Sequence, residues 1–221
     1  MRSDALERRR RIITAAAEIF RTQPETVALE TIAERAGVGI ATLYRNFPDR
    51  SALLYACGAY FFEQALALQH DILDSFDEHP ADSWNTYVNE LVNMGISHLV
   101  STFAPDDLNQ LPNDVAELRH HTQHNGERIL RKAKDHGLVA ENISYNTFII
   151  GLITVTRPPV PGILALEPHI TDQLVSLYLG GLAAGLDSPP PDRGQAKPCG
   201  AAEPAQRQPT RRQPVRGPQD P

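Results

Sequence analysis

The chain has 221 residues, of which 41% are hydrophobic and 22% are charged, so it is long enough to bury a core and has the composition of a globular protein. Its formal net charge of −6 is unevenly distributed: residues 1–60 carry 9 Arg against 7 Asp and Glu, whereas residues 61–187 carry 6 Lys and Arg against 17. This excludes a uniformly basic nucleic-acid binder and predicts that any contact with DNA is confined to the N-terminal part.

Cysteine content and hydropathy predict a cytoplasmic protein with no membrane partner. The two cysteines, Cys57 and Cys199, are too few for a disulfide framework and indicate a reducing compartment. The opening MRSDALERRRR lacks the apolar segment of a signal peptide. The longest apolar run, residues 174–186, is shorter than the roughly 20 residues that a membrane-spanning helix needs.

The first predicted element is an amphipathic helix from about Ala5 to Thr22. Its inner face is predicted to carry Leu6, Ile13, Ala16, Ala17 and Phe20, widened by Ile12 and Ile19. The run Arg8 to Arg11 lies near its start. These arginines either hold a phosphate backbone or reach into the minor groove, or they form a solvated charged face, and the sequence leaves both readings open.

A helix-turn-helix is predicted between Leu29 and Arg50. Apolar residues in the first helix recur with the i, i+3, i+4, i+7 spacing of one buried face. Gly37 is expected to end that helix in a left-handed conformation. A second helix from Ile40 to Phe47 places Leu43 and Phe47 on its inner side, Pro48 ends it, and Asp49 can cap the next helix.

The outer face of the second helix combines a cation, a phenol, a hydroxyl and small apolar groups, a mixture suited to the major groove of DNA. The alternative is a short solvated helix that only links two others. We assign base contacts to Ile40, Ala41, Thr42 and Tyr44, and phosphate contacts mainly to Arg45, Asn46 and Arg50. The candidate DNA-binding residues are Ile40, Ala41, Thr42, Tyr44, Arg45, Asn46, Arg50, Thr31 and Gly39.

The segment TIAERAGVGIATLYRNFPDRSALL, with RRRIITAAAEIF upstream, closely resembles the DNA-binding domain of the TetR (tetracycline repressor) family of bacterial transcriptional regulators. Ala28 and Gly39 depart from the usual Thr and Ser, and each departure removes a side-chain oxygen that can cap a helix and touch a phosphate. The resemblance implies an all-α fold: a three-helix DNA-binding domain (1–48) and a larger helical effector-binding and dimerisation domain (49–187). It also implies a homodimer, most often a repressor, released from a palindromic operator by a small molecule.

The second domain is predicted to be helical throughout. Apolar stripes and breaking residues predict helices over about 49–75, 83–103, 113–136, 143–156 and 168–186. The stripe of the first of these includes Gln64 and Leu68, and the family resemblance implies that this helix is a lever between ligand and DNA. The run FIIGLITV could also pass for a buried strand, but the helical period fits it and no partner strand lies nearby.

A small-molecule effector site is expected in this second domain, because pockets mix aromatic walls with a few polar groups. For each candidate taken alone, a core or surface position is favoured over a pocket position. The alternative function is a DNA-binding regulator whose second domain only dimerises or docks a protein. The candidate pocket residues are Trp84, Tyr87, Met94, His98, Phe103, His120, His124 and Phe148.

Metal binding and catalysis are not predicted. His120 and His124 have metal-ligand spacing with Glu117 on the same side, but the surrounding LRHHTQHNGER is polar enough for a solvated helix face to be favoured. No catalytic motif or phosphate-binding glycine loop is present, so we predict neither an enzyme nor a cofactor.

The last two helices are predicted to form the dimer interface, since Gly181 and Gly185 allow close helix approach; close packing within one subunit is the alternative. The candidate interface residues are Phe148, Leu152, Leu174, Leu177, Tyr178, Gly181 and Gly185. Residues 188–221 hold 9 of the 18 prolines and are predicted to be a disordered tail. We favour an inert extension over a weak DNA-binding role for this tail.

Overall fold

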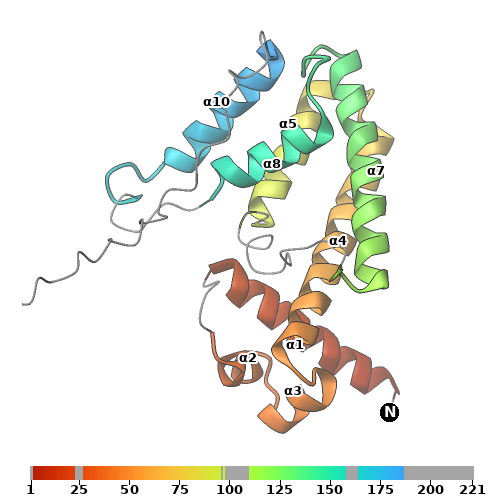
Figure 1. Ribbon diagram of the computed structural model, residues 1–221, viewed down its shortest axis with the longest axis vertical. Coiled ribbons are helices and arrows are strands. Elements are labelled where there is room, and N and C mark those ends of the chain that lie inside the picture. Colours follow the sequence, from red (N-terminus) through yellow and green to blue (C-terminus); the bar gives the residue numbers. More distant parts are fainter. Residues whose placement is uncertain (1, 23–26, 96, 98–109, 158–163, 187–221) are drawn as a thin grey trace, which may run out of the picture. The chain divides into compact units, whose positions relative to one another are not determined.

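The computed structural model describes residues 2–22, 27–95, 97, 110–157 and 164–186 (Figure 1). The chain divides into two units, 1–187 and 188–221, and the predicted tail lies outside the described residues. Every regular element in the described ranges is helical, and no strand occurs among them, so the predicted all-α fold is confirmed. None of the helices in these ranges is long and apolar enough to cross a membrane.

Helices α1 (Arg2–Thr22), α2 (Leu29–Arg35) and α3 (Ile40–Asn46) share one core with the start of α4 (Arg50–Ser75). Its largest fully buried side chains include Ile12, Phe20, Ile32, Leu43, Phe47 and Leu53. The prediction for Leu6 is wrong, because its side chain is 68% exposed. Ile12 and Ala16 define the buried face, and Leu6, six residues before Ile12, is turned away from it by the 3.6-residue period.

The turn between α2 and α3 is set by Gly37, whose φ of 64° confirms the predicted left-handed conformation. The Gly37 amide donates to the Glu34 carbonyl at 3.0 Å, and the Val38 amide donates to the Ala33 carbonyl at 2.9 Å. This pair of bonds satisfies two carbonyls at the end of α2 and fixes the direction in which the chain leaves it.

Capping at the start of α4 also follows the prediction. The Asp49 carboxylate accepts a hydrogen bond from the Ala52 amide at 2.8 Å. An N-cap carboxylate of this kind satisfies one of the free amides of the first turn. The long helix α4 therefore begins directly after the helix-turn-helix.

The second core forms around the other end of α4. Helices α5 (Pro80–Asn93), α7 (Asn113–Asp135), α8 (Tyr145–Val155) and α10 (Ile170–Ala184) contribute to it, and α7 lies alongside α4 (Figure 1). Its fully buried side chains include Phe76, Tyr87, Ile129, Ile143, Phe148 and Leu152. The run FIIGLITV lies in α8, so its predicted helical state is confirmed.

Two predictions for this half need correction. Helix α5 ends at Asn93, because Gly95 takes a φ of 73° and leads the chain out of the helix, and most of the predicted continuation to Phe103 lies outside the described residues. In α4 the buried glutamine is Gln69, whereas Gln64 is exposed. The face that α4 buries is marked by Ala65, Gln69 and Ile72, and Gln64 lies outside it.

Candidate functional site

The predicted reading face of α3 is accessible. Ala41, Tyr44 and Arg45 are exposed, and Ile40 and Thr42 are half-buried. Leu43 and Phe47, on the opposite side, are buried and hold α3 against the core. The two sides of this seven-residue helix thus divide as their residue types predict.

The remaining candidate DNA-binding residues surround this face. Thr31 and Gly39 are exposed, whereas Asn46 and Arg50 are half-buried. The Asn46 side-chain amide donates to the Thr42 carbonyl at 2.8 Å, so one of its donors already stabilises the end of α3. All four residues are therefore at least partly accessible to solvent.

The N-caps of α2 and α3 are Ala28 and Gly39, and neither has a side-chain oxygen. Both already have the extended backbone of a capping residue, with ψ of 144° at Ala28 and 148° at Gly39. A Cβ placed on Gly39 would meet nothing within 4 Å. A hydroxyl-bearing residue therefore fits at Gly39 without strain.

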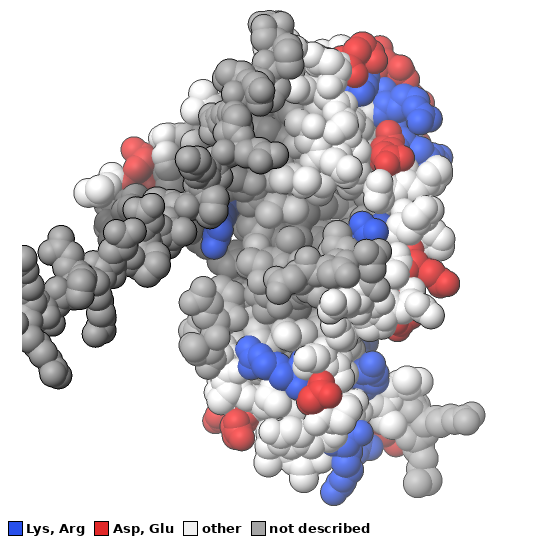
Figure 2. All heavy atoms as spheres, in the orientation of Figure 1, with Lys and Arg blue, Asp and Glu red and all other residues white. Residues whose placement is uncertain are grey.

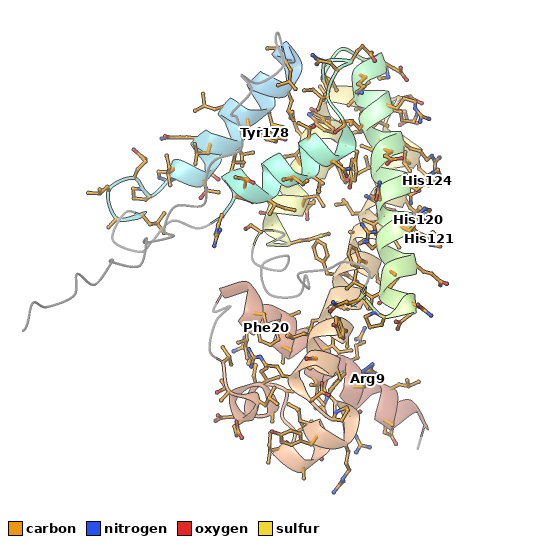
Figure 3. All side chains as sticks on the ribbon, viewed as in Figure 1. Arg9, Phe20, His120, His121, His124 and Tyr178 are labelled. Carbon is orange, nitrogen blue, oxygen red and sulfur yellow. The ribbon has the colours of Figure 1, made fainter. Side chains whose placement is uncertain are left out.

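The arginines of α1 have different environments. The Arg9 guanidinium lies 4.5 Å from the centroid of the Phe47 ring, a cation–π contact that joins α1 to the end of α3. Arg10 pairs with Glu7 at 3.7 Å, and Arg8 donates to the Asp4 carbonyl. Figure 2 shows Lys and Arg side chains around this part of the chain, and Figure 3 labels Arg9 on α1. Arg9 thus has a structural role that the sequence did not reveal.

Arg50 joins three elements. Its guanidinium donates to the Val27 carbonyl, just before α2, at 2.7 Å. It also lies 5.2 Å from the centroid of the Phe20 ring of α1. Since Arg50 is the first residue of α4, it fastens this helix to both α1 and the entrance of the helix-turn-helix. The phosphate role assigned to Arg50 stays a prediction beside this structural one.

In the second half, three predicted pocket residues come together. Phe148 lies 5.0 Å from Trp84 and 6.1 Å from Tyr87, measured between ring centroids, and all three are buried. Met94 is half-buried, and His98 and Phe103 lie outside the described residues. His120 and His124 are exposed on α7 (Figure 3), so they do not line the interior with the aromatic residues.

A buried polar group next to these rings was missed by the sequence analysis. Gln69 has no exposed surface and donates from Nε2 to Tyr87 Oη at 3.1 Å and to the Thr122 carbonyl at 3.0 Å. Tyr87 Oη lies 3.5 Å from Tyr145 Oη. Burial raises the pKa of both tyrosines, so both phenols stay neutral at physiological pH. The sequence signal that could have revealed this group is Gln69 itself, a polar residue within the apolar stripe of α4.

The predicted interface residues divide into two groups. On α10, Leu174, Leu177 and Gly181 are exposed along one stripe, with Leu177 73% exposed. On α8, Ile150 is 60% exposed. We call these four residues the α8–α10 face.

The other predicted interface residues are used inside the subunit. Phe148 and Leu152 are fully buried in its core, which removes them from the proposed interface. Tyr178 Oη lies 2.8 Å from the carbonyl oxygens of both Thr147 and Phe148, which share its single hydroxyl proton, so it fastens α10 to α8 (Figure 3). Gly185, with a φ of 83°, ends α10, and a Cβ there would lie 2.7 Å from the Cβ of Ala140.

Comparisons with known proteins agree with this architecture. Residues 12–57 match the family described as bacterial regulatory proteins, tetR family, and residues 79–184 match the C-terminal domain described as transcriptional regulator SbtR-like. An HTH-type transcriptional regulator of Staphylococcus aureus (strain USA300) is 43% identical over 56 residues, which are 25% of this chain and 30% of that protein. The chain therefore matches under a third of the length of this curated relative.

Solved structures show the same fold over a longer span. The TetR transcription regulatory protein of Mycobacterium vanbaalenii aligns with a TM-score of 0.57 and 21% identity, over 82% of this chain and 98% of that one. A TetR transcriptional regulator of Streptomyces coelicolor aligns with a TM-score of 0.55 and 23% identity, over 79% and 97%.

Proposed function

The chain belongs to the TetR family of bacterial transcriptional regulators, and we propose that it is a repressor that leaves a palindromic operator when a small effector binds. The observation that carries this proposal is the exposed face of α3, which offers Ala41, Tyr44 and Arg45 to the solvent while Leu43 and Phe47 anchor the helix. A short helix presented in this way fits the major groove of DNA.

Base recognition is assigned to the start and middle of α3. Ile40 and Ala41 present methyl groups that suit thymine, and Thr42 and Tyr44 add hydroxyl groups that can bond base edges. Arg45, at the end of α3, is exposed and suited to a phosphate. Thr31 and Gly39 are exposed near the starts of α2 and α3 and supply further contacts to DNA phosphates.

A homodimer is needed because one short helix reads only a few base pairs, and a two-fold dimer reads two such half-sites. The α8–α10 face supports this assembly, since Leu174, Leu177 and Ile150 are exposed apolar residues and the exposed Gly181 lets a second helix approach α10 closely.

Replacing Leu177 by Glu places a charge on this face and should convert dimers to monomers in sedimentation experiments. Leu166→Glu is the matched control, because Leu166 is 83% exposed but lies outside α10. Loss of dimers in both variants would argue against the α8–α10 face as the specific contact.

Release by an effector follows from linkage. An effector lowers DNA affinity only if it binds more tightly to a conformation whose two α3 helices do not match adjacent major grooves. α4 connects the two halves, because Arg50 at its start holds the helix-turn-helix and its later turns contact α5 and α7. A shift of α4 in the effector-binding half is therefore expected to move α3.

Thr42→Ala tests the base-reading assignment. We expect it to weaken binding to the preferred operator by roughly 1 to 3 kcal/mol, the discrimination that one base interaction supplies, and to leave nonspecific binding unchanged. Thr86→Ala, an exposed change on α5, is the control. Binding of both DNA types is measured by fluorescence anisotropy, and an equal reduction for both would refute the assignment of Thr42 to bases.

A further inference from the structure

Gln69 links four helices of the second core through a buried polar cluster. From α4 it donates to Tyr87 Oη of α5 and to the Thr122 carbonyl of α7, and Tyr87 Oη in turn lies 3.5 Å from Tyr145 Oη of α8. We call Gln69, Tyr87, Thr122 and Tyr145 the interior polar cluster. Gln69 and Tyr87 have no exposed surface.

The orientation of the Gln69 amide is determined by its neighbours. The Thr122 carbonyl can only accept, so the atom 3.0 Å from it has to be the NH2 group. Both protons of that group are then used, one on Thr122 and the other on Tyr87. The remaining atom, Oε1, is buried and has no hydrogen-bond partner in the part of the chain that the structure describes.

A buried carbonyl oxygen without a donor is unfavourable, so a native protein that keeps one normally supplies a partner from outside the fold. The partner of Oε1 has to carry an O–H or N–H group, since Oε1 can only accept. A partner of Oε1 is therefore a hydrogen-bond donor.

The surroundings of the cluster indicate which kind of partner suits Gln69 Oε1. Phe148 lies 5.0 Å from Trp84 and 6.0 Å from Tyr145, between ring centroids, so the region is largely aromatic. Tyr145 also covers Gly126, where a Cβ would come within 2.3 Å of its ring. Burial raises the pKa of Tyr87 and Tyr145 because a charged group is poorly solvated here, and a charged ligand would meet the same penalty. An uncharged, mainly apolar molecule suits these surroundings.

We propose that Gln69 Oε1 is the polar anchor of the effector site and that the effector is an uncharged, mainly apolar molecule with a hydroxyl or N–H donor, such as a phenol or an alcohol. This inference rests on the proposed function, in which the second half binds a small effector. Because Gln69 lies on α4, a molecule bound to it contacts the helix whose first residue, Arg50, holds the helix-turn-helix.

Phenol and anisole test the donor requirement, because anisole replaces the phenol proton by a methyl group. Binding to the full chain is measured by calorimetry and ligand-observed NMR. We expect phenol to bind about tenfold more tightly than anisole, the difference expected for one buried hydrogen bond.

Gln69→Met keeps a similar length without the amide, and it should abolish the preference for phenol. Gln64→Met on the exposed side of α4 is the matched control and should retain that preference. If Gln69→Met does not fold, a crystal of the unsubstituted protein grown with phenol answers the question. The phenol oxygen should then lie within hydrogen-bond distance of Gln69 Oε1.

Benzoate tests the competing explanation, an anion held by Arg119. The Nε of Arg119, on α7 one turn before Thr122, is also buried without a partner in the described structure. Binding of benzoate in preference to phenol would overturn the proposal. Equal binding of phenol and anisole, or binding of neither, would do the same and leave a trapped water as the partner of Oε1.

DNA binding without any ligand, measured in parallel, separates this proposal from the proposed function. Sequence-specific DNA binding with no selective phenol binding would overturn only the inference about Gln69. Absence of specific DNA binding would instead contradict the proposed function.

Discussion

Arg50→Met separates two roles for the arginine at the start of α4. In the structure its guanidinium donates to the Val27 carbonyl at 2.7 Å and lies 5.2 Å from the Phe20 ring centroid, whereas the sequence assigned it to a phosphate. Methionine preserves much of the apolar stem and removes both interactions. The structural role predicts a loss of stability, and the phosphate role predicts a change in salt dependence.

The structure sets the size of the expected loss. A hydrogen bond from a charged donor contributes about 1.5 to 3 kcal/mol, and a cation–π contact at a partly exposed site about 0.5 to 1 kcal/mol. Because Arg50 is half-buried, we expect Arg50→Met to lower the free energy of unfolding by about 2 kcal/mol. For a folded unit of this size that corresponds to a fall in Tm of roughly 4 to 8 °C.

Thermal unfolding and a salt titration of DNA binding measure the two effects, and Arg45→Met is the matched control. Arg45 is exposed, so its replacement should leave Tm unchanged and reduce the slope of log K against log salt by about 0.9, the value for one phosphate. Arg50→Met should lower Tm because of the structural role, and the phosphate role predicts a reduced slope as well. An unchanged Tm together with a reduced slope in Arg50→Met would refute the structural role.

Four further results are expected. Ala28→Ser should stabilise the fold by about 1 kcal/mol in denaturant titrations, because the extended backbone at this N-cap lets a hydroxyl accept from the first turn of α2; no gain would contradict the capping geometry. Tyr178→Phe should cost about 1 kcal/mol by the same assay, since its hydroxyl proton is shared by two α8 carbonyls, and an unchanged stability would contradict this contact. The hydrogen bond from Lys132 lowers the pKa of Asp77, so the contribution of Asp77 to folding stability is present above the ordinary carboxyl pKa and is lost as pH falls through the lowered pKa. Asp77→Asn should therefore be less stable than wild type at neutral pH, and the unfolding curves of the two proteins should converge in acid. Burial raises the pKa of Cys57 to about 12, so in a Cys199→Ser background this thiol should resist thiol reagents at pH about 8 until denaturant is added, and rapid native labelling would contradict its burial.

The helix-turn-helix could be predicted closely from the sequence, because its signals are local. Gly37 ends α2, Asp49 caps α4, and the apolar spacing of Leu43 and Phe47 fixes the phase of α3. Each of these features depends on the conformational preference of one residue or on spacing within one turn.

The second half was harder because its helices are apolar on more than one side. In α8 the run from Phe148 to Val155 is mostly apolar, so sequence spacing could not decide that Phe148 and Leu152 turn inward while Ile150 is exposed. That choice depends on packing against other helices. Gln69 was missed for the same reason. The apolar spacing in α4 did not decide which face of the helix is buried, and a small rotation of that face replaces Gln69 by Gln64, which is in fact exposed.

The central claim is that a dimer reads DNA through α3, and selection of bound sequences from randomised duplex DNA at near-physiological salt tests it most directly. We predict a two-fold symmetric motif whose half-sites lie about one helical turn apart, and we predict that Thr42→Ala relaxes the preference at particular positions of each half-site. Binding that is sensitive to salt but indifferent to sequence would contradict the claim.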